Sequence, residues 1–520
     1  MLEVKNLRVH FKHYGETIKA VDGIDFKIGD NEIVGLVGES GSGKTVTALS
    51  VTRLLPRKDC EASGEVNFSI SEIGERDLMR TEEKDILRIR GSEIAMIFQE
   101  PSTSLNPVLR IGEQIEEVLI EHEKISKADA RRRAIGLLEK VKINNPERVY
   151  NAYPHLISGG EKQRVMIAMA IALNPKLLIA DEPTTALDVT IQNEILELIM
   201  ALKTELGMSV LFITHDFSVI KKVADTILVM KNGVVVEAGH ANEIFSNPKH
   251  EYTKKLLNAV PRIEEEEPRT GQQKAKEIIA LRNSGKVFLQ EELMPGRPRH
   301  KVTALKNVNL AIKEGMTLGV VGESGSGKTT LGKLITGLIE PTCGDVIGRE
   351  LKWGTQMVFQ DPYDSLDPLM NMEDIVLEGL TIKGVKRETK NNILREMLFK
   401  VRLNYGDRLK YPHQFSGGQR QRIAIARALA VKPRIIVLDE PVSSLDVVIQ
   451  SEIIQLLKDI QKELSLTYIF ISHDLRVIGY LADEVAVMYK GEVVEFGPKY
   501  DIYHNPKHPY TKKLLSSALL

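Results

Sequence analysis

Cysteine is nearly absent from this 520-residue chain, because Cys60 and Cys343 are its only two. Two distant cysteines exclude a disulfide framework and a cysteine-rich metal site, and they suit a reducing cytoplasm. Long hydrophobic runs are lacking too, since the apolar run at 165–173 stops at Asn174-Pro175, far short of the ~20 residues that span a bilayer. We therefore expect a chain that crosses no membrane. Charges from the third residue onward also argue against a signal peptide.

Neither sign of charge dominates the sequence. Lys and Arg number 70 against 71 Asp and Glu, which leaves a formal net charge of -1. This balance gives no general attraction to nucleic acid or to anionic membranes. Aromatic residues make up only 5% of the chain and hydrophobic residues 42%, an ordinary composition for a globular protein.

The chain does contain a duplication. The segment VGESGSGKT occurs at 37–45 and again, without a change, at 321–329. From Ser158 onward, matching features lie 258 positions apart. Nearer the repeated segments the spacing is wider, 284 positions for Lys44 and Lys328 and 261 for Gln99 and Gln360. The second copy therefore lacks 23 residues, which correspond to the polar stretch around 71–91 of the first.

A chain of this length exceeds a single hydrophobic core, so the duplication predicts two domains. We place them at 1–260 and 278–520, with an acidic linker at 261–277 that contains EEEEP and few apolar residues. Each half alternates short β-rich runs with helical patterns. That alternation predicts an α/β fold with a largely parallel sheet.

Both copies of the repeat fit the phosphate-binding loop G-x-x-x-x-G-K-[ST] between a strand and a helix. Glycines let backbone N–H groups turn toward phosphate oxygens, and the helix N-terminus adds its positive dipole end. Lys44 and Lys328 are expected to reach the β- and γ-phosphates of ATP, and Thr45 and Thr329 to ligate Mg²⁺. A flexible Gly/Ser linker is the alternative, and two matches in strand–helix context disfavour it. The predicted ATP-binding residues of the loops are Gly38, Ser40, Gly41, Ser42, Gly43, Lys44, Thr45 and Thr47, and Gly322, Ser324, Gly325, Ser326, Gly327, Lys328, Thr329 and Thr330.

Paired carboxylates follow a buried apolar run in each half. These are Asp181-Glu182 and Asp439-Glu440, at the strand ends where open α/β sheets bind ligands. The aspartates suit Mg²⁺ binding, and the glutamates suit polarising the water that attacks the γ-phosphate. An ordinary strand-to-helix loop with an N-cap is the alternative. Because both glutamates are present, we predict two hydrolytic sites.

A Ser-Gly-Gly turn opens a predicted helix in each half, and its free N–H groups offer a further anion site. Together with two glutamines and two histidines, these turns make the chain resemble an ATP-binding-cassette (ABC) ATPase with two fused cassettes. The residues that carry the resemblance are Ser158, Gly159, Gly160, Gln99 and His215 in the first half, and Ser416, Gly417, Gly418, Gln360 and His473 in the second.

This resemblance implies a fold and a geometry. Each cassette would have a P-loop (RecA-like) core, a small antiparallel β subdomain and a helical signature subdomain. The cassettes would pair head to tail, so that each ATP lies between the loop of one half and the signature of the other. Gln99 and Gln360 would contact Mg²⁺ or water, and His215 and His473 the γ-phosphate. Asp188 and Asp446 would lie in the loop that meets the opposite half, and each could also cap the following helix.

The two halves also depart from the family pattern. Glu161 replaces the usual signature glutamine and adds negative charge near one site, whereas Gln419 keeps it and is expected among the ATP-binding residues. Tyr14 lies where the family often stacks an aromatic ring on adenine, although it could equally be a packing residue. The corresponding segment of the second half, 295–300, holds no aromatic residue other than His300.

Several longer stretches closely resemble the two ATPases of oligopeptide/dipeptide importers. Each half ends in NPKH-x-Y-TKKLL, for which local helix capping is the alternative interpretation. Some relatives hold an iron–sulfur centre in a cysteine cluster after the cassette, and without such cysteines we expect none here. The stretches are MIFQEPSTSLNP at 96–107, ALDVTIQ at 186–192, MVFQDPYDSLDP at 357–368, and the tails at 247–257 and 505–515.

The resemblance implies a prokaryotic ATPase subunit, peripheral on the cytoplasmic face of the plasma membrane, that energises import of peptides or a related small solute. Its partners would be two membrane-spanning permease subunits and an extracellular or periplasmic solute-binding protein, with no nucleic acid. A soluble tandem-cassette ATPase acting on ribosomes or nucleic acid is the alternative, which the short acidic linker and the lack of zinc cysteines disfavour. Cargo contacts other subunits, so peptides, nickel chelates, glutathione and oligosaccharides all stay open.

Overall fold

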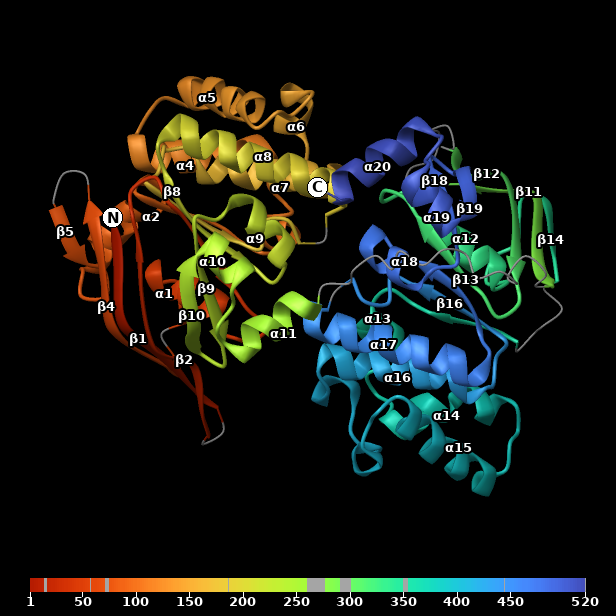
Figure 1. The fold of residues 1–520 in the computed structure, drawn as a ribbon. Coiled ribbons are helices and arrows are strands. Elements are labelled where there is room, and N and C mark those ends of the chain that lie inside the picture. Colours follow the sequence, from red (N-terminus) through yellow and green to blue (C-terminus); the bar gives the residue numbers. More distant parts are fainter. Residues whose placement is uncertain are drawn as a thin grey trace. The chain divides into compact units, whose positions relative to one another are not determined.

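The structure of the protein is a computed structural model that describes residues 1–13, 16–56, 58–70, 74–185, 187–259, 276–289, 301–348, 354–443 and 445–519. Contacts within the chain separate two compact units, one formed by Met1–Leu187 and Ile191–Ala259 and the other mainly by Val260–Leu520 (Figure 1). Nearly all of the predicted linker at 261–277 lies outside the described residues.

The first unit is built on a six-stranded sheet with the order β10-β9-β3-β8-β7-β6. Only β10 at the edge pairs antiparallel, and the other neighbours pair parallel. Strands β3, β7 and β8 are buried at every position, as expected for parallel strands covered on both faces. The largely parallel α/β fold that the sequence predicts is thus confirmed. The strands are β3 (Ile33–Val37), β6 (Ile94–Ile97), β7 (Leu177–Asp181), β8 (Ser209–Thr214), β9 (Thr226–Lys231) and β10 (Val234–His240).

A second, antiparallel sheet has the order β2-β1-β4-β5. One hydrophobic core joins it to the first sheet through helix α1, because Leu7 and Val9 of β1, Ala48 of α1, and Leu36 of β3 belong to the same buried cluster. This packing holds α1, and therefore the loop that precedes it, between the two sheets. The elements are β1 (Leu2–His13), β2 (Glu16–Ile28), β4 (Cys60–Ile70), β5 (Gly74–Asp77) and α1 (Lys44–Val51).

The remaining helices of the first unit fall into two groups. Helices α4, α5, α6 and α7 pack on one another and form the predicted helical subdomain (Figure 1). The others connect or follow the strands of the parallel sheet. The bounds are α2 (Glu83–Ser92), α3 (Pro101–Ser104), α4 (Ile111–Glu123), α5 (Lys127–Lys140), α6 (Pro146–Asn151), α7 (Gly159–Ala170), α8 (Val189–Leu206), α9 (Phe217–Val223), α10 (Ala241–Ser246) and α11 (Glu251–Ala259).

The second unit repeats this plan. Its six-stranded sheet has the order β15-β16-β17-β13-β18-β19, and its antiparallel sheet the order β12-β11-β14. The strands are β11 (Glu277–Leu289), β12 (Lys301–Lys313), β13 (Thr317–Val321), β14 (Cys343–Ile347), β15 (Thr355–Val358), β16 (Ile435–Asp439), β17 (Thr467–Ile471), β18 (Glu484–Tyr489) and β19 (Glu492–Pro498). The helices are α12 (Lys328–Ile335), α13 (Pro362–Ser365), α14 (Met372–Ile382), α15 (Arg387–Lys400), α16 (Gly417–Ala430), α17 (Val447–Leu464), α18 (Leu475–Leu481), α19 (Lys499–His504) and α20 (Pro509–Leu519).

The shorter second copy differs where the spacing of the repeats indicates. Strand β5 and helix α2 lie in the segment of the first unit that has no sequence counterpart in the second. In the described part of the second unit, no strand or helix lies between β14 and β15. The 23 missing residues therefore account for one strand and one helix.

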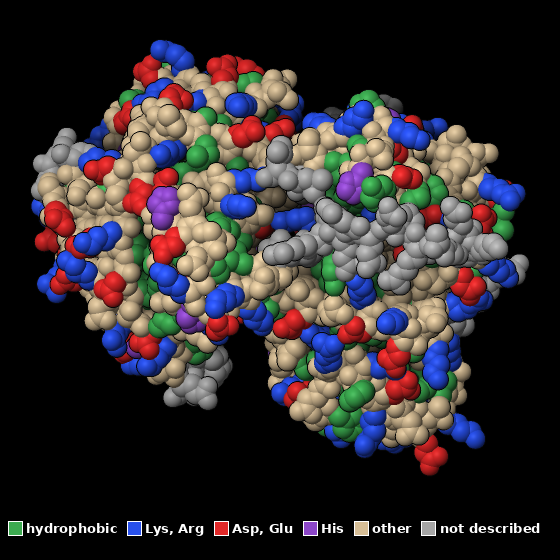
Figure 2. Space-filling view, in the orientation of Figure 1, with side chains coloured by type: hydrophobic (Ala, Val, Ile, Leu, Met, Phe, Trp, Pro, Cys, Tyr) green, Lys and Arg blue, Asp and Glu red, His purple; other side chains and the backbone are tan. Residues whose placement is uncertain are grey.

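The charges on the surface and the length and polarity of the helices agree with what the composition predicts. Side chains of both charges are intermixed over the face shown in Figure 2. Within the described ranges, every helix is too short or too polar to cross a bilayer.

Candidate nucleotide site

Each phosphate-binding loop joins a central strand to a helix, as the motif requires. The first connects β3 to α1 and the second connects β13 to α12. Gly43 and Gly327 precede the helices with φ of 105° and 102°, in the left-handed region that favours glycine. A Cβ on Gly43 would lie only 2.3 Å from the Ala20 carbonyl oxygen. The loop therefore needs glycine here both for its backbone angle and for space.

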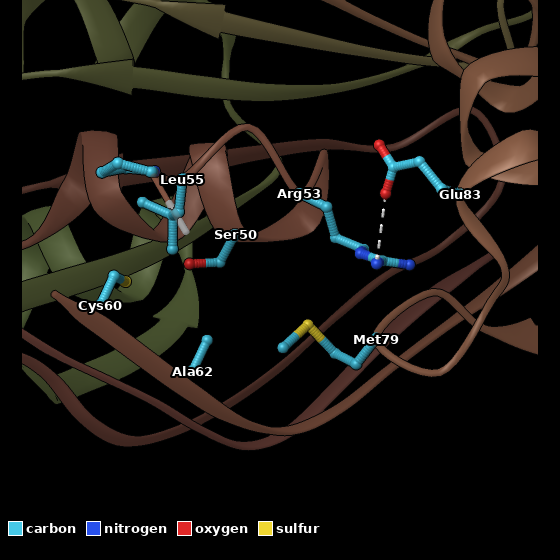
Figure 3. Close-up of a pocket in the computed structure, with 8 residues that line it drawn as sticks. Ser50, Arg53, Leu55, Cys60, Ala62, Met79 and Glu83 are labelled. Carbon is cyan, nitrogen blue, oxygen red and sulfur yellow. Dashed lines mark ion pairs between the residues drawn. The ribbon is translucent and has the colours of Figure 1, made fainter. Parts of the chain in front are cut away.

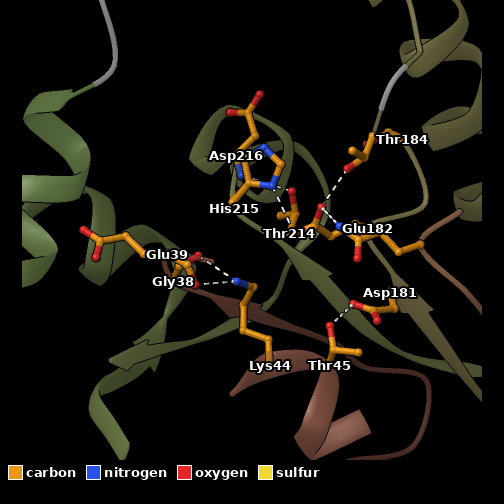
Figure 4. A network of polar contacts seen from close by, with 12 residues as sticks. Gly38, Glu39, Lys44, Thr45, Asp181, Glu182, Thr184, Thr214, His215 and Asp216 are labelled. Atoms are coloured by element: carbon orange, nitrogen blue, oxygen red, sulfur yellow. Dashed lines mark hydrogen bonds and ion pairs between the residues drawn. The ribbon is translucent and has the colours of Figure 1, made fainter. Parts of the chain in front are cut away.

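The lysine of each loop turns back onto its own loop, as Figure 4 shows for Lys44. Lys44 Nζ donates to the carbonyl oxygens of Gly38 at 2.8 Å and Glu39 at 2.9 Å. In the second unit, Lys328 Nζ donates to the first two loop carbonyls at 2.7 and 3.0 Å. Burial lowers the pKa of Lys328 below its ordinary value. Both ammonium groups are thus held inside the loop that they are expected to serve.

The loops also present polar groups that a phosphate would satisfy. Within the described part of the chain, the hydroxyls of Ser42 and Ser326 are buried and make no hydrogen bond. Leaving a buried polar group unsatisfied costs about 1–3 kcal/mol. Phosphate oxygens accept hydrogen bonds readily, so the residues present fit a nucleotide phosphate at both loops.

A hydroxyl and a carboxylate meet next to each loop and fit a magnesium ion. Thr45 Oγ1 lies 3.3 Å from Asp181 Oδ1, and Thr329 Oγ1 lies 3.2 Å from Asp439 Oδ1. Mg²⁺ in phosphate-transfer sites is usually held by one or two protein oxygens together with waters and substrate phosphates. Burial raises the pKa of Asp181 and of Asp439 to about 6, although the threonine hydroxyls lower it in part. A buried carboxylate with this pKa gains from a nearby cation.

The predicted glutamate, glutamine and histidine come together in the first unit. Gln99 Nε2 donates to Glu182 Oε2 at 2.9 Å, and His215 Nδ1 lies 3.1 Å from Glu182 Oε1. Burial alone would raise the pKa of Glu182, but the hydrogen bond and charge of His215 outweigh it and lower this pKa to about 2. Glu182 in turn raises the pKa of His215 against the effect of burial. The glutamate is therefore ionised and oriented by its partners.

The second unit repeats this arrangement. Gln360 Nε2 donates to Glu440 Oε2 at 3.3 Å, and His473 Nδ1 lies 3.1 Å from the same oxygen. Burial would raise the pKa of Glu440, but His473 outweighs it and lowers this pKa. Thr185 Oγ1 donates to the Glu182 carboxylate, and Ser443 Oγ donates to the Glu440 backbone carbonyl and also lowers the pKa of the Glu440 carboxyl.

Both glutamates have a strained backbone. Glu182 has φ of 47° and Glu440 has φ of 45°, in the left-handed region that side-chain-bearing residues rarely adopt. Their N–H groups donate to Ile213 and Ile471 at 2.9 Å in the neighbouring strands, which helps to hold this conformation. Strain of this kind costs about 1–3 kcal/mol and gathers at functional sites.

The signature turns cap their helices. Ser158 and Glu161 form a capping box at the start of α7, and Ser416 and Gln419 form one at the start of α16. The extra negative charge of Glu161 is compensated, since this carboxylate pairs with Arg148. Glutamate and glutamine serve the cap equally well, so the departure from the usual signature keeps the local structure.

The remaining predicted residues lie as follows. The Thr47 hydroxyl is fully buried and donates to the Gly43 carbonyl at 2.9 Å. It is therefore bonded to the backbone at the start of α1 instead of to Asp181 or Glu182. Thr330 lies in the first turn of α12. Asp446 caps α17 by accepting from the Ile449 N–H. Tyr14 and the segment 295–300 lie outside the described residues.

A small surface pocket lies near the far end of α1 (Figure 3). It has a volume of about 150 Å³ and contains none of the predicted nucleotide-site residues. Part of its wall comes from the segment that the second cassette lacks. Its lining residues are Ser50, Arg53, Leu55, Pro56, Cys60, Ala62, Met79 and Glu83.

Comparison with known proteins decides the family. The sequence profile of the ABC transporter family matches residues 21–185 and 305–443. The chain belongs to the ABC transporter family. The profile of the oligopeptide/dipeptide transporter C-terminal region also matches, at 236–290 and 494–519, so both NPKH tails of this ABC protein fall in that region.

Relatives of this ABC protein match it over its whole length. A peptidoglycan transport ATP-binding protein of Agrobacterium fabrum is 45% identical over 100% of this chain and 96% of its own. A glutathione import ATP-binding protein of Pectobacterium atrosepticum is 40% identical over 100% of this chain and 89% of its own. An archaeal ribosome recycling factor, solved in complex with a ribosomal stalk protein, covers 90% of this chain and 86% of its own with a TM-score of 0.59, but at 20% identity it shows the fold alone.

These matches confirm the prediction of an oligopeptide/dipeptide-type importer ATPase with two fused ABC cassettes. The chain is the ATP-binding and ATP-hydrolysing subunit of an importer, and such a subunit works with membrane permeases.

Two tyrosines outside the predicted set also reach the loops. The hydroxyl of Tyr252 accepts a hydrogen bond from the Glu39 N–H at 3.1 Å, and that of Tyr510 from the Glu323 N–H at 3.0 Å. Both belong to the NPKH-x-Y tails, which the sequence marks only as family features with a capping alternative. The identical 258-residue spacing of the two tyrosines was the signal that could have selected them.

The buried aspartates give a stability prediction. We expect Asp181→Asn to raise the unfolding temperature of the nucleotide-free protein at pH 8 and to raise it only about half as much at pH 5. The folded-state pKa, about 6, exceeds the ordinary 3.8, so stability falls as pH rises from 3.8 to about 6 and stays lower above it. At ~1.4 kcal/mol per pKa unit, the difference is roughly 3 kcal/mol.

Thermal unfolding at the two pH values, with Asp439→Asn as the matched variant of the other cassette, checks this. A lower unfolding temperature for both variants at pH 8 would contradict the burial argument. We also expect Mg²⁺ to stabilise the wild-type protein more than either variant.

Proposed function

We propose that each of the two cassettes holds the phosphates of MgATP at its own loop and hydrolyses the γ-phosphate to energise solute import. The observation that carries this proposal is that one constellation recurs in both units, with the loop lysine, the Thr–Asp pair and the Gln–Glu–His group at matching places. We also propose domain bounds of 1–260 and 278–520 with a linker at 261–277, and the support is that the chain divides into two compact units near residue 260.

The chain's residues have distinct tasks in this reaction. Lys44 and Lys328 exchange their loop carbonyls for phosphate oxygens, and the loop N–H groups and helix N-termini stabilise the negative charge. Thr45 with Asp181, and Thr329 with Asp439, would hold Mg²⁺. When bound, this ion neutralises charge on the β- and γ-phosphate oxygens.

Glu182 and Glu440 orient the attacking water and accept its proton. Their histidine partners, His215 and His473, keep the carboxylates ionised and directed toward the site. Gln99 and Gln360 donate to the same carboxylates. Displacement of either glutamine would therefore change the orientation of the glutamate that accepts the proton.

We further propose that each ATP-binding site is completed by the signature turn of the other cassette, which is Ser158-Gly159-Gly160 or Ser416-Gly417-Gly418. The support is that each turn opens a helix with its serine exposed. ATP that touches both cassettes binds the closed arrangement better than the open one, and this difference supplies the driving force for closure.

The importer setting is proposed from the relatives. The subunit would sit peripherally on the cytoplasmic face of the plasma membrane with two permease subunits and an external solute-binding protein. Relatives named for peptidoglycan transport and glutathione import point to peptide-like solutes that carry amide bonds.

Affinity purification from membranes followed by reconstitution tests the function. We expect the tagged chain to retain two membrane permeases, and the complex in proteoliposomes to take up labelled peptide only with ATP. The chain carrying both Glu182→Gln and Glu440→Gln serves as the inactive control. Recovery of the chain with ribosomes and without permeases would overturn the proposal. Uptake assays with glutathione and with a muropeptide, run in parallel, would identify the class of solute.

A further inference from the structure

The tail of each cassette reaches the phosphate loop through one tyrosine. Tyr252 lies on α11 and Tyr510 on α20, 258 positions apart. The side chains are only 5% and 8% exposed. Each phenol oxygen accepts from the N–H of the second loop residue, Glu39 or Glu323. The same contact thus forms independently in both units.

The tyrosine and the lysine hold opposite ends of a single peptide unit. The carbonyl of Gly38 and the N–H of Glu39 belong to one planar trans peptide, so they point in opposite directions. Lys44 Nζ donates to that carbonyl at 2.8 Å while the N–H donates to Tyr252 at 3.1 Å. Fixing the N–H therefore fixes the direction of the oxygen that holds the lysine.

In the second unit, the peptide between Gly322 and Glu323 is held by the same two hydrogen bonds. Lys328 Nζ donates to the Gly322 oxygen at 2.7 Å and the Glu323 N–H donates to Tyr510 at 3.0 Å. Two independent copies with matching geometry argue against a chance contact.

The tail is itself fastened to the cassette. Glu237 of β10 accepts from the backbone N–H groups of Lys249 at 2.7 Å and His250 at 3.1 Å, just before α11. His250 Nδ1 then accepts from the Tyr252 N–H at 3.1 Å. In the second unit Glu495 and His508 make the equivalent bonds, at 2.7, 3.0 and 3.2 Å. The NPKH segment thus sets the position from which the tyrosine reaches the loop.

The tyrosine rings are held by different neighbours in the two units. Lys231 Nζ lies 4.7 Å from the centre of the Tyr252 ring, whereas the ring of Tyr489 lies 4.3 Å from that of Tyr510. Burial raises the pKa of Tyr510 to about 12, so its hydroxyl stays neutral at physiological pH. The part common to both units is the hydroxyl on the loop.

We propose that Tyr252 and Tyr510 are positioning residues for ATP binding, which orient the first peptide of each phosphate loop and hold the loop lysine ready for phosphate. This assigns the tail a task at the nucleotide site, and it rests on the proposed binding of ATP phosphates at both loops. Loss of the hydroxyl lets that peptide turn, and part of the binding energy must then go into restoring it.

Replacing either tyrosine by phenylalanine tests the inference. We expect Tyr510→Phe to weaken ATP binding at its site about tenfold and to raise the KM for ATP while changing kcat less than about twofold, because the oriented loop is regained once ATP is bound. Without nucleotide, the Glu323 amide should exchange hydrogen faster by about tenfold or more. Tyr252→Phe should do the same at Glu39.

Tyr468→Phe is the matched control in the second cassette. This buried tyrosine of β17 donates to the Leu457 carbonyl at 3.2 Å and does not touch the loop, so its loss tests general destabilisation. Equal ATP affinity and equal Glu323 exchange in Tyr510→Phe and Tyr468→Phe would overturn the inference. Glu495→Gln, which loosens the tail without altering the tyrosine, should change affinity in the same direction as Tyr510→Phe. If the wild-type chain binds no ATP, the proposed function fails; if it binds and the tyrosine variants bind equally, only this inference fails.

Discussion

Replacing Glu182 and Glu440 by glutamine in one chain is expected to lower ATP turnover by about 10²–10⁴-fold, the usual contribution of a general base. Binding should survive, because glutamine has nearly the same shape and the loop lysines remain in place. Each glutamate is ionised in the structure and held by a histidine and a glutamine, so removing its charge removes the proton acceptor. Steady-state ATPase assays and an ATP-binding titration on the same preparations measure both effects.

The single variants decide whether the two sites are equally competent. We expect Glu182→Gln and Glu440→Gln each to lose much of the wild-type turnover, since the two units share one constellation. Full wild-type turnover in either single variant would refute equal competence. Glu117→Gln, which changes an exposed carboxylate on α4, controls for the substitution itself.

Replacing Lys44 and Lys328 by alanine is expected to weaken ATP binding by about 100-fold or more at the altered site. Truncating one partner of a buried, hydrogen-bonded charge pair costs about 2–5 kcal/mol. The lysines are 5% and 6% exposed, and each is held by two loop carbonyls that point it into the loop.

Calorimetric titration gives a direct measure, because each single variant should reduce the stoichiometry of tight ATP binding from two to one per chain. Lys127→Ala on the exposed start of α5 is the matched surface control. An unchanged stoichiometry in Lys44→Ala would show that the first loop does not hold the phosphates.

The two cassettes differ in the residues around their nucleotide sites more than in the residues of the sites themselves. The lysine, threonine, aspartate, glutamate, glutamine and histidine contacts recur with distances within a few tenths of an ångström. Glu161 differs from Gln419, but both cap their helices and Glu161 is paired with Arg148. The segment that the second cassette lacks contains β5 and α2 and contributes Met79 and Glu83 to the pocket of Figure 3.

The amino-acid sequence by itself determined the family, the duplication and the parts of the site. A phosphate loop is a local feature, since strand, glycines, lysine and helix follow one another within about twenty residues. Likewise Asp181 and Glu182 are recognisable because they end a buried apolar run. The buried strands and their alternation with helices follow from the same local patterns, whereas the order of the strands in each sheet came only from the structure.

Tertiary structure alone decided which distant groups meet. Gln99 reaches Glu182 across 83 positions, and Tyr252 reaches Glu39 across 213. The sequence marks the first pair only through family resemblance, and it marks Tyr252 only as part of a repeated tail without indicating its partner. The physical reason is that a hydrogen bond of this kind depends on how the sheet, helices and tail pack together. The NPKH tail shows this most plainly, because its residues predict a capped helix, whereas the fold brings that helix to the loop where ATP is expected to bind.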